Sequence, residues 1–100
     1  MRVIAKSTLV AFGSRHPEAW SAIERWHSVI RNGAWRSPAD LQSAFSSAAV
    51  LNGERVRFEI AVGNYRLIAA FDFRRQIAFV KFLGTHAEYD KIDALTVSQF

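Results

Sequence analysis

Alternation of apolar and other side chains dominates the second half of the chain. Arg55–Ile60 alternates strictly (RVRFEI), and Tyr65–Phe73 and Gln76–Leu83 are rich in β-branched and aromatic residues. The turn-forming pair Gly63–Asn64 separates the first two runs, and Arg74–Arg75 separates the last two. Runs of this kind bounded by turn signals predict three strands joined by hairpins.

The first third of the chain predicts a short strand and a long helix. Met1–Ala5 has β-branched residues at its centre and favours a strand. A helical stripe begins near Leu9, and Gly13–Ser14 is expected to interrupt it. Glu18–Arg31 is predicted to form the main helix, because apolar-side residues recur at helical spacing: Trp20, Ile23, His27 and Ile30.

A second, shorter helix is predicted after Ser37. Ser37–Asp40 (SPAD) combines a capping serine, a proline at the first position and an acid in the first turn. Ser46–Asn52 is expected to be a loop. The order of elements predicts an α+β fold, in which the N-terminal strand and the helices pack on one face of an antiparallel β-sheet. All 100 residues are expected to form a single domain.

The alternation also assigns side chains to the two faces of the sheet. With a two-residue turn at Arg74–Arg75, Ile68 lies opposite Lys81. Arg66 then lies opposite Leu83 and diagonally across from Lys81, about 7–8 Å away. One face is apolar and is expected to lie under the helices: Val56, Phe58, Ile60, Tyr65, Leu67, Ala69, Phe71, Phe73, Ala78, Val80 and Phe82. The other, called the second face below, carries the charges: Arg55, Arg57, Glu59, Arg66, Asp72 and Lys81, with Ile68, Ala70 and Phe79.

Composition narrows the functions that such a face could serve. The formal charge is +4, which favours a polyanionic partner such as nucleic acid. Two interpretations stay open: a phosphate-binding face, or a solvated face on which Glu59 and Arg66 form a weak ion pair of about 0–1 kcal/mol. The chain has no cysteine, and its three histidines are not spaced as metal ligands, so no metal or other cofactor is expected. Without an apolar leader or spanning segment, we expect a soluble, cytoplasmic protein that does not contact membranes.

Gly84–Asp90 (GTHAEYD) follows the last strand and supplies the groups that RNA cleavage requires. Thr85 and Glu88 form a capping box, which predicts a short helix with His86 in its first turn. RNA cleavage without a metal needs a base, an acid and cations around the phosphate. His86 suits acid or base chemistry near neutral pH, and Tyr89 suits hydrogen bonding or stacking on a base. Arg66 and Lys81 suit charge stabilisation.

Three stretches resemble the HigB toxins of the RelE-like group: Tyr65–Leu67 (YRL), Ile77–Phe82 (IAFVKF) and above all Gly84–Asp93 (GTHAEYDKID). The resemblance implies a RelE-like fold and an mRNA endoribonuclease that acts on the translating ribosome. It also implies neutralisation by a helix-turn-helix antitoxin of the HigA type, with DNA contacted only through the toxin–antitoxin complex.

Carried over by position, the resemblance identifies candidate catalytic residues: Arg66, His86 and Tyr89, and less firmly Lys81. The chain departs from the family at Glu59, where an asparagine is often found, and at Ala61–Asn64, where the family often has a Gly-Gly-Asn-Lys type of turn. These departures leave Arg55 and Arg57 to carry more of the contacts to the RNA backbone. The candidate RNA-binding residues are Arg55, Arg57, Asn64 and Lys91. Two alternatives remain: a non-catalytic basic module that binds RNA or the ribosome, and a partner protein that has lost toxicity because Glu59 neutralises Arg66.

Overall fold

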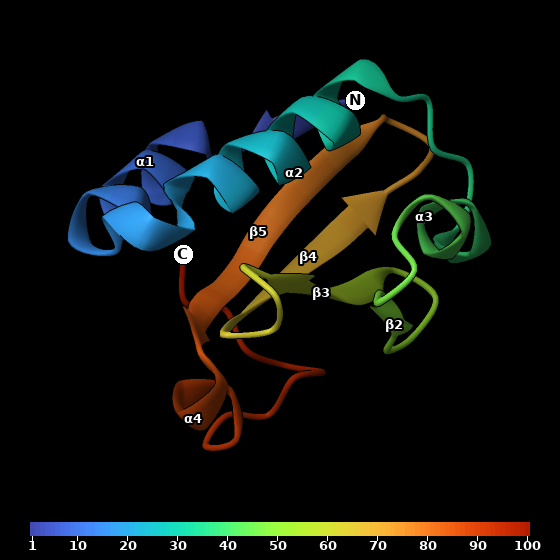
Figure 1. Cartoon of the computed structure of the whole chain (residues 1–100). Coiled ribbons are helices and arrows are strands. Elements are labelled where there is room, and N and C mark those ends of the chain that lie inside the picture. Colours follow the sequence, from blue (N-terminus) through green and yellow to red (C-terminus); the bar gives the residue numbers. More distant parts are fainter.

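A five-stranded sheet carries two helices across one of its faces (Figure 1), in a computed structural model that describes all 100 residues. The strands lie in the order β1-β5-β4-β3-β2. Their bounds are β1 Arg2–Ile4, β2 Ala49–Val50, β3 Arg55–Ile60, β4 Tyr65–Asp72 and β5 Ile77–Thr85. β1 runs parallel to β5, and the other pairs are antiparallel. The predicted α+β fold is therefore confirmed, and β1 adds a parallel edge.

The helices occupy three different places around the sheet (Figure 1). Helices α1 (Lys6–Arg15) and α2 (Trp20–Asn32) cover one face, and a 3₁₀ turn at Pro17–Ala19 joins them. Helix α3 (Pro38–Ala44) lies beside β2, and α4 (His86–Tyr89) follows β5 directly. The longest helix has 13 residues, and none is long and apolar enough to cross a membrane.

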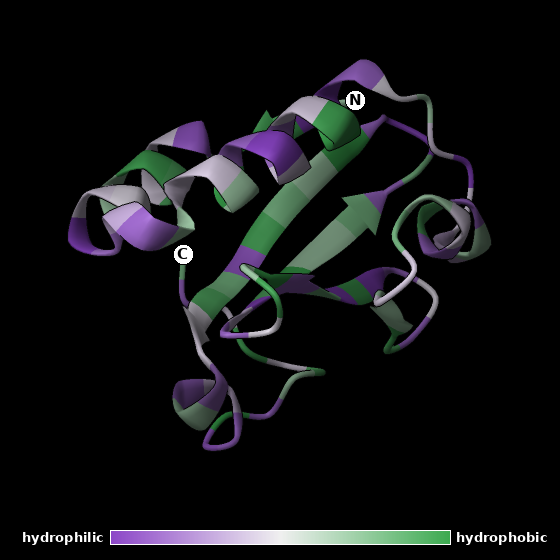
Figure 2. Ribbon diagram, in the orientation of Figure 1, coloured by the Kyte–Doolittle hydropathy of each residue, from purple (hydrophilic) through white to green (hydrophobic).

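The core fills the space between α1, α2 and the sheet. It consists of 18 buried residues, among them Ile23, Trp26 and Ile30 of α2 and Phe58 and Leu67 of the sheet. Figure 2 shows the hydrophobic stretches of β4 and β5 beneath α2. Full burial of one such side chain stabilises the fold by about 1.5–3 kcal/mol. The requirement to bury one face throughout is what fixes the orientation of the charged residues on the other.

Two predictions about the helices and loops of the first half were wrong. Gly13–Ser14 does not interrupt the first helix, which continues to Arg15. The reason is packing, because the missing side chain of Gly13 lets the indole of Trp20 lie directly on the helix backbone. The predicted loop Ser46–Asn52 contains β2, which pairs with β3 at Arg57 and Val56. The capping serine of α3 is confirmed, since Ser37 Oγ accepts a hydrogen bond from the Asp40 amide.

The register of β4 and β5 agrees with prediction near the hairpin and departs from it further along. Asp72 lies opposite Ile77, as a turn centred on Arg74–Arg75 requires. A β-bulge between Ile68 and Ala69 then shifts the pairing by one residue, so that Ile68 lies opposite Phe82. Arg66 consequently lies opposite Gly84 and not Leu83.

The bulge also exchanges the faces of two apolar residues. Leu83 belongs to the core under the helices, whereas Phe82 was predicted there and lies on the second face. Lys81 is the extra residue of the bulge, so its predicted position opposite Ile68 was wrong. A bulge places two residues of one strand against one of its partner and turns the following side chains over.

Replacement of Gly13 by alanine should destabilise the fold. A Cβ atom at Gly13 would lie 2.4 Å from Cε3 of Trp20, so the indole or the helix would have to shift. The clash should outweigh the gain in helix propensity and cost about 1–2 kcal/mol in the free energy of unfolding. Denaturant titration measures it. Gly53→Ala is the control, because a Cβ atom at Gly53 meets nothing within 4 Å; equal stability of the two variants would contradict the packing argument.

Candidate nucleic-acid interface

The C-terminal segment (residues 90–100) lies across the second face of the sheet. Nη1 of Arg55 donates hydrogen bonds to the carbonyl oxygens of Ala94 (3.2 Å) and Val97 (2.8 Å). At the other side, the Gln99 amide donates to the Lys81 carbonyl at 2.8 Å, and the Leu83 amide donates to Oε1 of Gln99 at 2.9 Å. The segment is thus held at both β3 and β5.

Arg55 is therefore an anchor within the fold. Only 9% of the residue is exposed, and its guanidinium is used by the segment that crosses it. Ile68 and Phe82 on the same face are buried as well. The guanidinium of Arg55, which was predicted to contact RNA, is instead used by the carbonyl oxygens of Ala94 and Val97.

Beyond the crossing segment, one arginine of β3 and one of β4 converge on a single carboxylate oxygen. Oε1 of Glu59 lies 3.6 Å from Nη2 of Arg66 and 4.0 Å from Nη2 of Arg57. The cross-strand pairing of Glu59 with Arg66 is the one that alternation predicted. In both arginines the Nε–H is buried and has no hydrogen-bond partner. Two cations thus share one acid, and part of their donor capacity is unused.

The loop between β3 and β4 holds Arg66 in place. Its carbonyl at Gly63 accepts a hydrogen bond from Nη1 of Arg66 at 2.5 Å. Three consecutive residues of the loop have positive φ: Ala61 (54°), Val62 (57°) and Gly63 (85°). Positive φ values favour glycine. The backbone of this loop therefore matches the glycine-rich turn that is frequent in the HigB toxins, which the sequence resembles. The loop also contacts α4, because the His86 amide donates to the Asn64 carbonyl at 3.3 Å.

Helix α4 completes the rim of the interface. Both hydrogen bonds of the predicted capping box between Thr85 and Glu88 are present, which fixes the first turn. The side chain of His86 is 57% exposed, with Nδ1 at 3.5 Å from Oδ2 of Asp90. The Tyr89 ring lies 5.9 Å from the Arg57 guanidinium carbon. An exposed imidazole and an aromatic ring therefore stand beside the paired arginines.

The structure brings together some of the predicted site residues and separates others. Arg57, Arg66 and Tyr89 are connected by the contacts above, and His86 adjoins them through the loop. Lys81 is turned away: its ammonium lies 5.6 Å from the centre of the Phe79 ring, toward the β4–β5 hairpin. The side chains of Asn64 and Lys91 are exposed and make no ion pair or hydrogen bond.

Sequence reasoning missed a second polar cluster, on the helix side of the sheet. His16 stacks on Phe12 with ring centres 4.4 Å apart. Its Nδ1 is 3.3 Å from the Tyr65 hydroxyl, which donates a hydrogen bond to Glu18. This bond lowers the pKa of Glu18 and raises the pKa of Tyr65. Nothing in the local sequence pairs residues so far apart, so the cluster had no signal.

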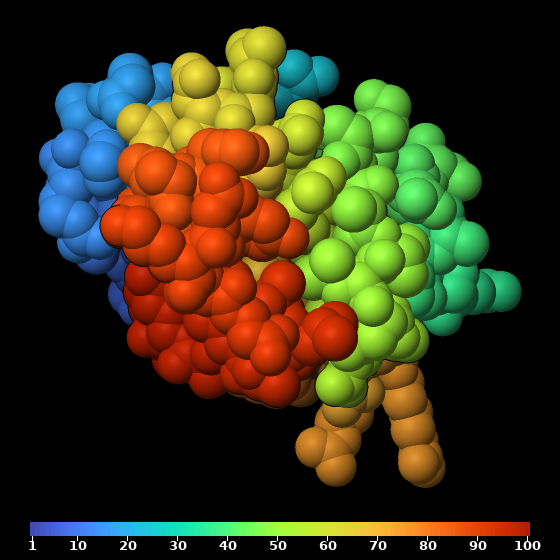
Figure 3. Space-filling view, turned by 90° about the horizontal axis from the view of Figure 1, so that it is seen from below, coloured from blue at the N-terminus to red at the C-terminus, as the bar shows by residue number.

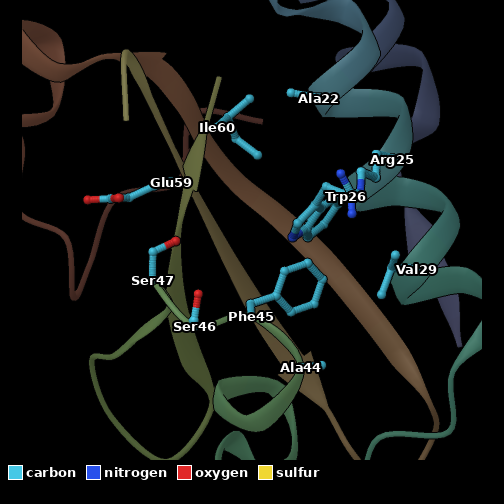
Figure 4. A pocket seen from close by; sticks show the side chains of 10 residues that line it. All are labelled: Ala22, Arg25, Trp26, Val29, Ala44, Phe45, Ser46, Ser47, Glu59 and Ile60. Carbon is cyan, nitrogen blue, oxygen red and sulfur yellow. The ribbon is translucent and has the colours of Figure 1, made fainter. Parts of the chain in front are cut away.

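The hollow between α2 and β3 lies outside this interface (Figure 4). It has a volume of about 390 Å³, with Trp26 and Phe45 facing each other across it. Glu59 lines its edge, but the carboxylate points away from the two rings. The arginine pair and α4 belong to the other side of β3.

The fold and the site together define a class of small α+β proteins. Members of this class carry paired arginines, an aromatic ring and an exposed imidazole at one end of the sheet. The family model of the HigB toxin, the RelE-like toxic component of a toxin–antitoxin system, matches residues 19–92. The chain belongs to this family. It is also 28% identical over 94 residues to the mRNA interferase HigB of Escherichia coli O6:H1, covering 92% of this chain and 91% of that protein.

Replacement of Tyr65 by phenylalanine tests the missed cluster. Because the pKa of Glu18 is lowered, the group stabilises the fold at pH values above its ordinary pKa of 4.5. This stability is lost as the pH falls through the lowered pKa. Because the pKa of Tyr65 is raised, the group stabilises the fold at pH values below its ordinary pKa of 10.0. That stability is lost as the pH rises through the raised pKa. Tyr65→Phe should therefore show a small loss of thermal stability at neutral pH that shrinks toward both extremes.

Tyr89→Phe is the control for this experiment, because the Tyr89 hydroxyl makes no hydrogen bond within the protein. Its melting temperature should follow that of the unmodified protein at every pH. A pH-independent difference between Tyr65→Phe and the unmodified protein would show that the hydroxyl acts through packing and not through Glu18.

Proposed function

We propose that this protein is an endoribonuclease toxin that cuts mRNA without a metal ion, at the end of the second face next to α4. The observation that carries the proposal is the pair Arg57 and Arg66, which hold a single half-exposed carboxylate between them that a phosphate can replace. Its similarity to a protein named mRNA interferase supports the reaction class. The two guanidiniums are the groups that would stabilise charge on a phosphate bound there.

The reaction is an attack of a 2′-hydroxyl on the adjacent phosphorus. The 2′-oxygen loses its proton and forms a bond to phosphorus, while the bond from phosphorus to the 5′-oxygen breaks and that oxygen gains a proton. The products are a 2′,3′-cyclic phosphate and a 5′-hydroxyl. Arg66 and Arg57 stabilise the charge that grows on the phosphate. His86, exposed and oriented by Asp90, serves one of the two proton transfers as base or acid, and solvent water serves the other. The Tyr89 ring stacks on a base.

Glu59 is the residue that phosphate must displace. It occupies the terminal nitrogens that would otherwise bind the substrate. A phosphate carries its charge on several oxygens and can accept from both guanidiniums at once, whereas the single Glu59 oxygen is at 3.6 and 4.0 Å from them. The ion pairs of Glu59 must nevertheless be broken first. We therefore expect the exchange of carboxylate for phosphate to require that further contacts, such as those a ribosome supplies, position the RNA.

The proposal extends to the partners of the protein. Membership of a family of toxic components implies an antitoxin. We propose a helix-turn-helix antitoxin of the HigA type, which contacts DNA on behalf of the complex, and the translating ribosome as the place where mRNA is cut in the cytoplasm. A helix-turn-helix protein encoded beside this one and co-purifying with it would support this, and a neighbour of a different fold that binds the toxin would argue against it.

Substitution of Arg66 or His86 should abolish the toxic effect. Loss of one charge-stabilising donor slows such reactions about 10²–10³-fold, and loss of a proton-transfer group about 10²–10⁴-fold. Growth arrest on induced expression and primer extension on cellular mRNA measure the loss for Arg66→Gln and His86→Ala. Arg31→Ala, an exposed arginine at the end of α2, is the control and should behave like the unmodified toxin. If both site variants arrest growth and cut mRNA normally, the assignment is wrong.

Replacement of Glu59 by asparagine should strengthen RNA binding. The change removes the acid that competes with phosphate, and exposed or half-exposed ion pairs of this kind are worth about 0–1 kcal/mol, so the gain should be on the order of five-fold. The same change leaves Arg57 and Arg66 facing each other and should lower thermal stability. Filter binding and thermal melting of one preparation measure both. Unchanged RNA affinity would show that Glu59 is no competitor.

The arginines and the Tyr89 ring would also serve one alternative, a module that binds RNA or the ribosome by charge and stacking without cutting. In that case the arginines contact phosphate and no bond is broken. Primer extension separates the two: bound mRNA without new 5′-ends would establish the binding module, and new ends that require His86 would exclude it.

A further inference from the structure

The second face has a part that the C-terminal segment leaves open, next to the β4–β5 hairpin. A hollow of about 380 Å³ lies there, lined by Glu54, Ala70, Phe71, Asp72, Phe73, Arg74 and Phe79. None of these residues belongs to the proposed cutting site. Arg66 and Asp72 are six residues apart on β4, which corresponds to about 20 Å along a strand.

Phe79 forms the aromatic wall of this hollow. It lies between Ala78 and Val80, which are buried in the core, so its own side chain points to the second face. Its partner across the ladder is Ala70, whose methyl group leaves the ring half-exposed. The Lys81 ammonium lies over the ring at 5.6 Å from its centre. An aromatic face with a cation above it is a typical contact of single-stranded nucleic acids.

Exposed arginines stand at the rim of the hollow. Figure 3 shows long side chains of the β4–β5 connection extending clear of the rest of the surface. Arg75 is weakly paired, with Nε at 3.8 Å from Oδ2 of Asp72, whereas Arg74 makes no ion pair. The acids Glu54 and Asp72 line the hollow itself. Phosphate is thus attracted to the rim and repelled from the interior.

We propose that this hollow is an accessory nucleotide subsite for single-stranded RNA, and the proposal rests on the function proposed above. A base stacks against Phe79, and the phosphate next to it contacts Arg74. The carboxylates of Asp72 and Glu54 accept hydrogen bonds from the exocyclic amino group of the base, as acids do when they contact cytosine. Bases with an amino group are therefore preferred to uracil.

RNA binding by a cleavage-deficient protein tests the subsite. The parent is His86→Ala, and the ligands are fluorescein-labelled oligoribonucleotides of about 12 residues, one adenine- and cytosine-rich and one of uracil only, titrated at several salt concentrations. Anisotropy should show that adding Phe79→Ala weakens binding of the first oligonucleotide about five-fold to 100-fold. Phe79→Leu keeps the apolar bulk and should lose most of the same affinity, which separates stacking from loss of folding.

The charged groups give independent readouts. Adding Arg74→Ala should reduce the slope of log K against log salt by about 0.7, as removal of one phosphate contact does for single strands. Asp72→Asn should reduce the preference for the amino-bearing oligonucleotide over the uracil one. Arg31→Ala is the control of equal charge and should leave the oligonucleotide preference and the effect of Phe79 unchanged.

Three results would overturn the subsite: no binding by the parent at low salt, unchanged binding by both Phe79 variants, or equal effects of Arg74→Ala and Arg31→Ala on the salt slope. If these occur while cutting of mRNA still requires Arg66 and His86, only the subsite is refuted. If neither Arg66 nor His86 matters for cutting, the proposed function fails first.

Discussion

The β-bulge at Lys81 decides which side chains meet on the second face. Without it, strict alternation would bury Phe82 under the helices and expose Leu83. With it, Leu83 enters the core, and Phe82 packs against Tyr89 at 6.2 Å between ring centres. Gly84 then lies opposite Arg66, at a position where a Cβ atom would lie 2.7 Å from the Phe82 ring. One extra residue thus brings α4 beside the arginines and turns Lys81 toward the hairpin.

The electrostatics around Arg66 follow from this arrangement. Arg66 is only 9% exposed, so its charge is costly unless it is paired, and Glu59 and the Gly63 carbonyl supply the partners. The same burial makes the guanidinium effective once phosphate replaces the acid, because interactions strengthen where water is excluded. Glu59 is therefore consistent with a toxin that keeps its cations in place while free of substrate.

Local sequence patterns predicted four of the five strands, the pairing of Glu59 with Arg66 and the capping box of α4, because each depends on residues close in sequence or on a period of two. They failed where a tertiary contact decided the outcome. The adjacent apolar pair Phe82–Leu83 carries no sign of which residue turns inward. The use of Arg55 as an anchor depends on a segment about forty residues away, and the contact of His16 with Tyr65 depends on packing between a helix end and a strand.

The C-terminal segment determines how an RNA strand could use both ends of the second face. It crosses from Arg55 on β3 to Lys81 on β5, and so separates the arginine pair from the hollow at Phe79. Residues 94–100 (ALTVSQF) carry no charged side chain, so the crossing adds no cation to the second face. A strand bound at both ends would pass over this segment between the arginine pair and Arg74. Affinity would then depend on both regions at once, whereas the proposed chemical step would depend only on the end that carries Arg57, Arg66 and His86.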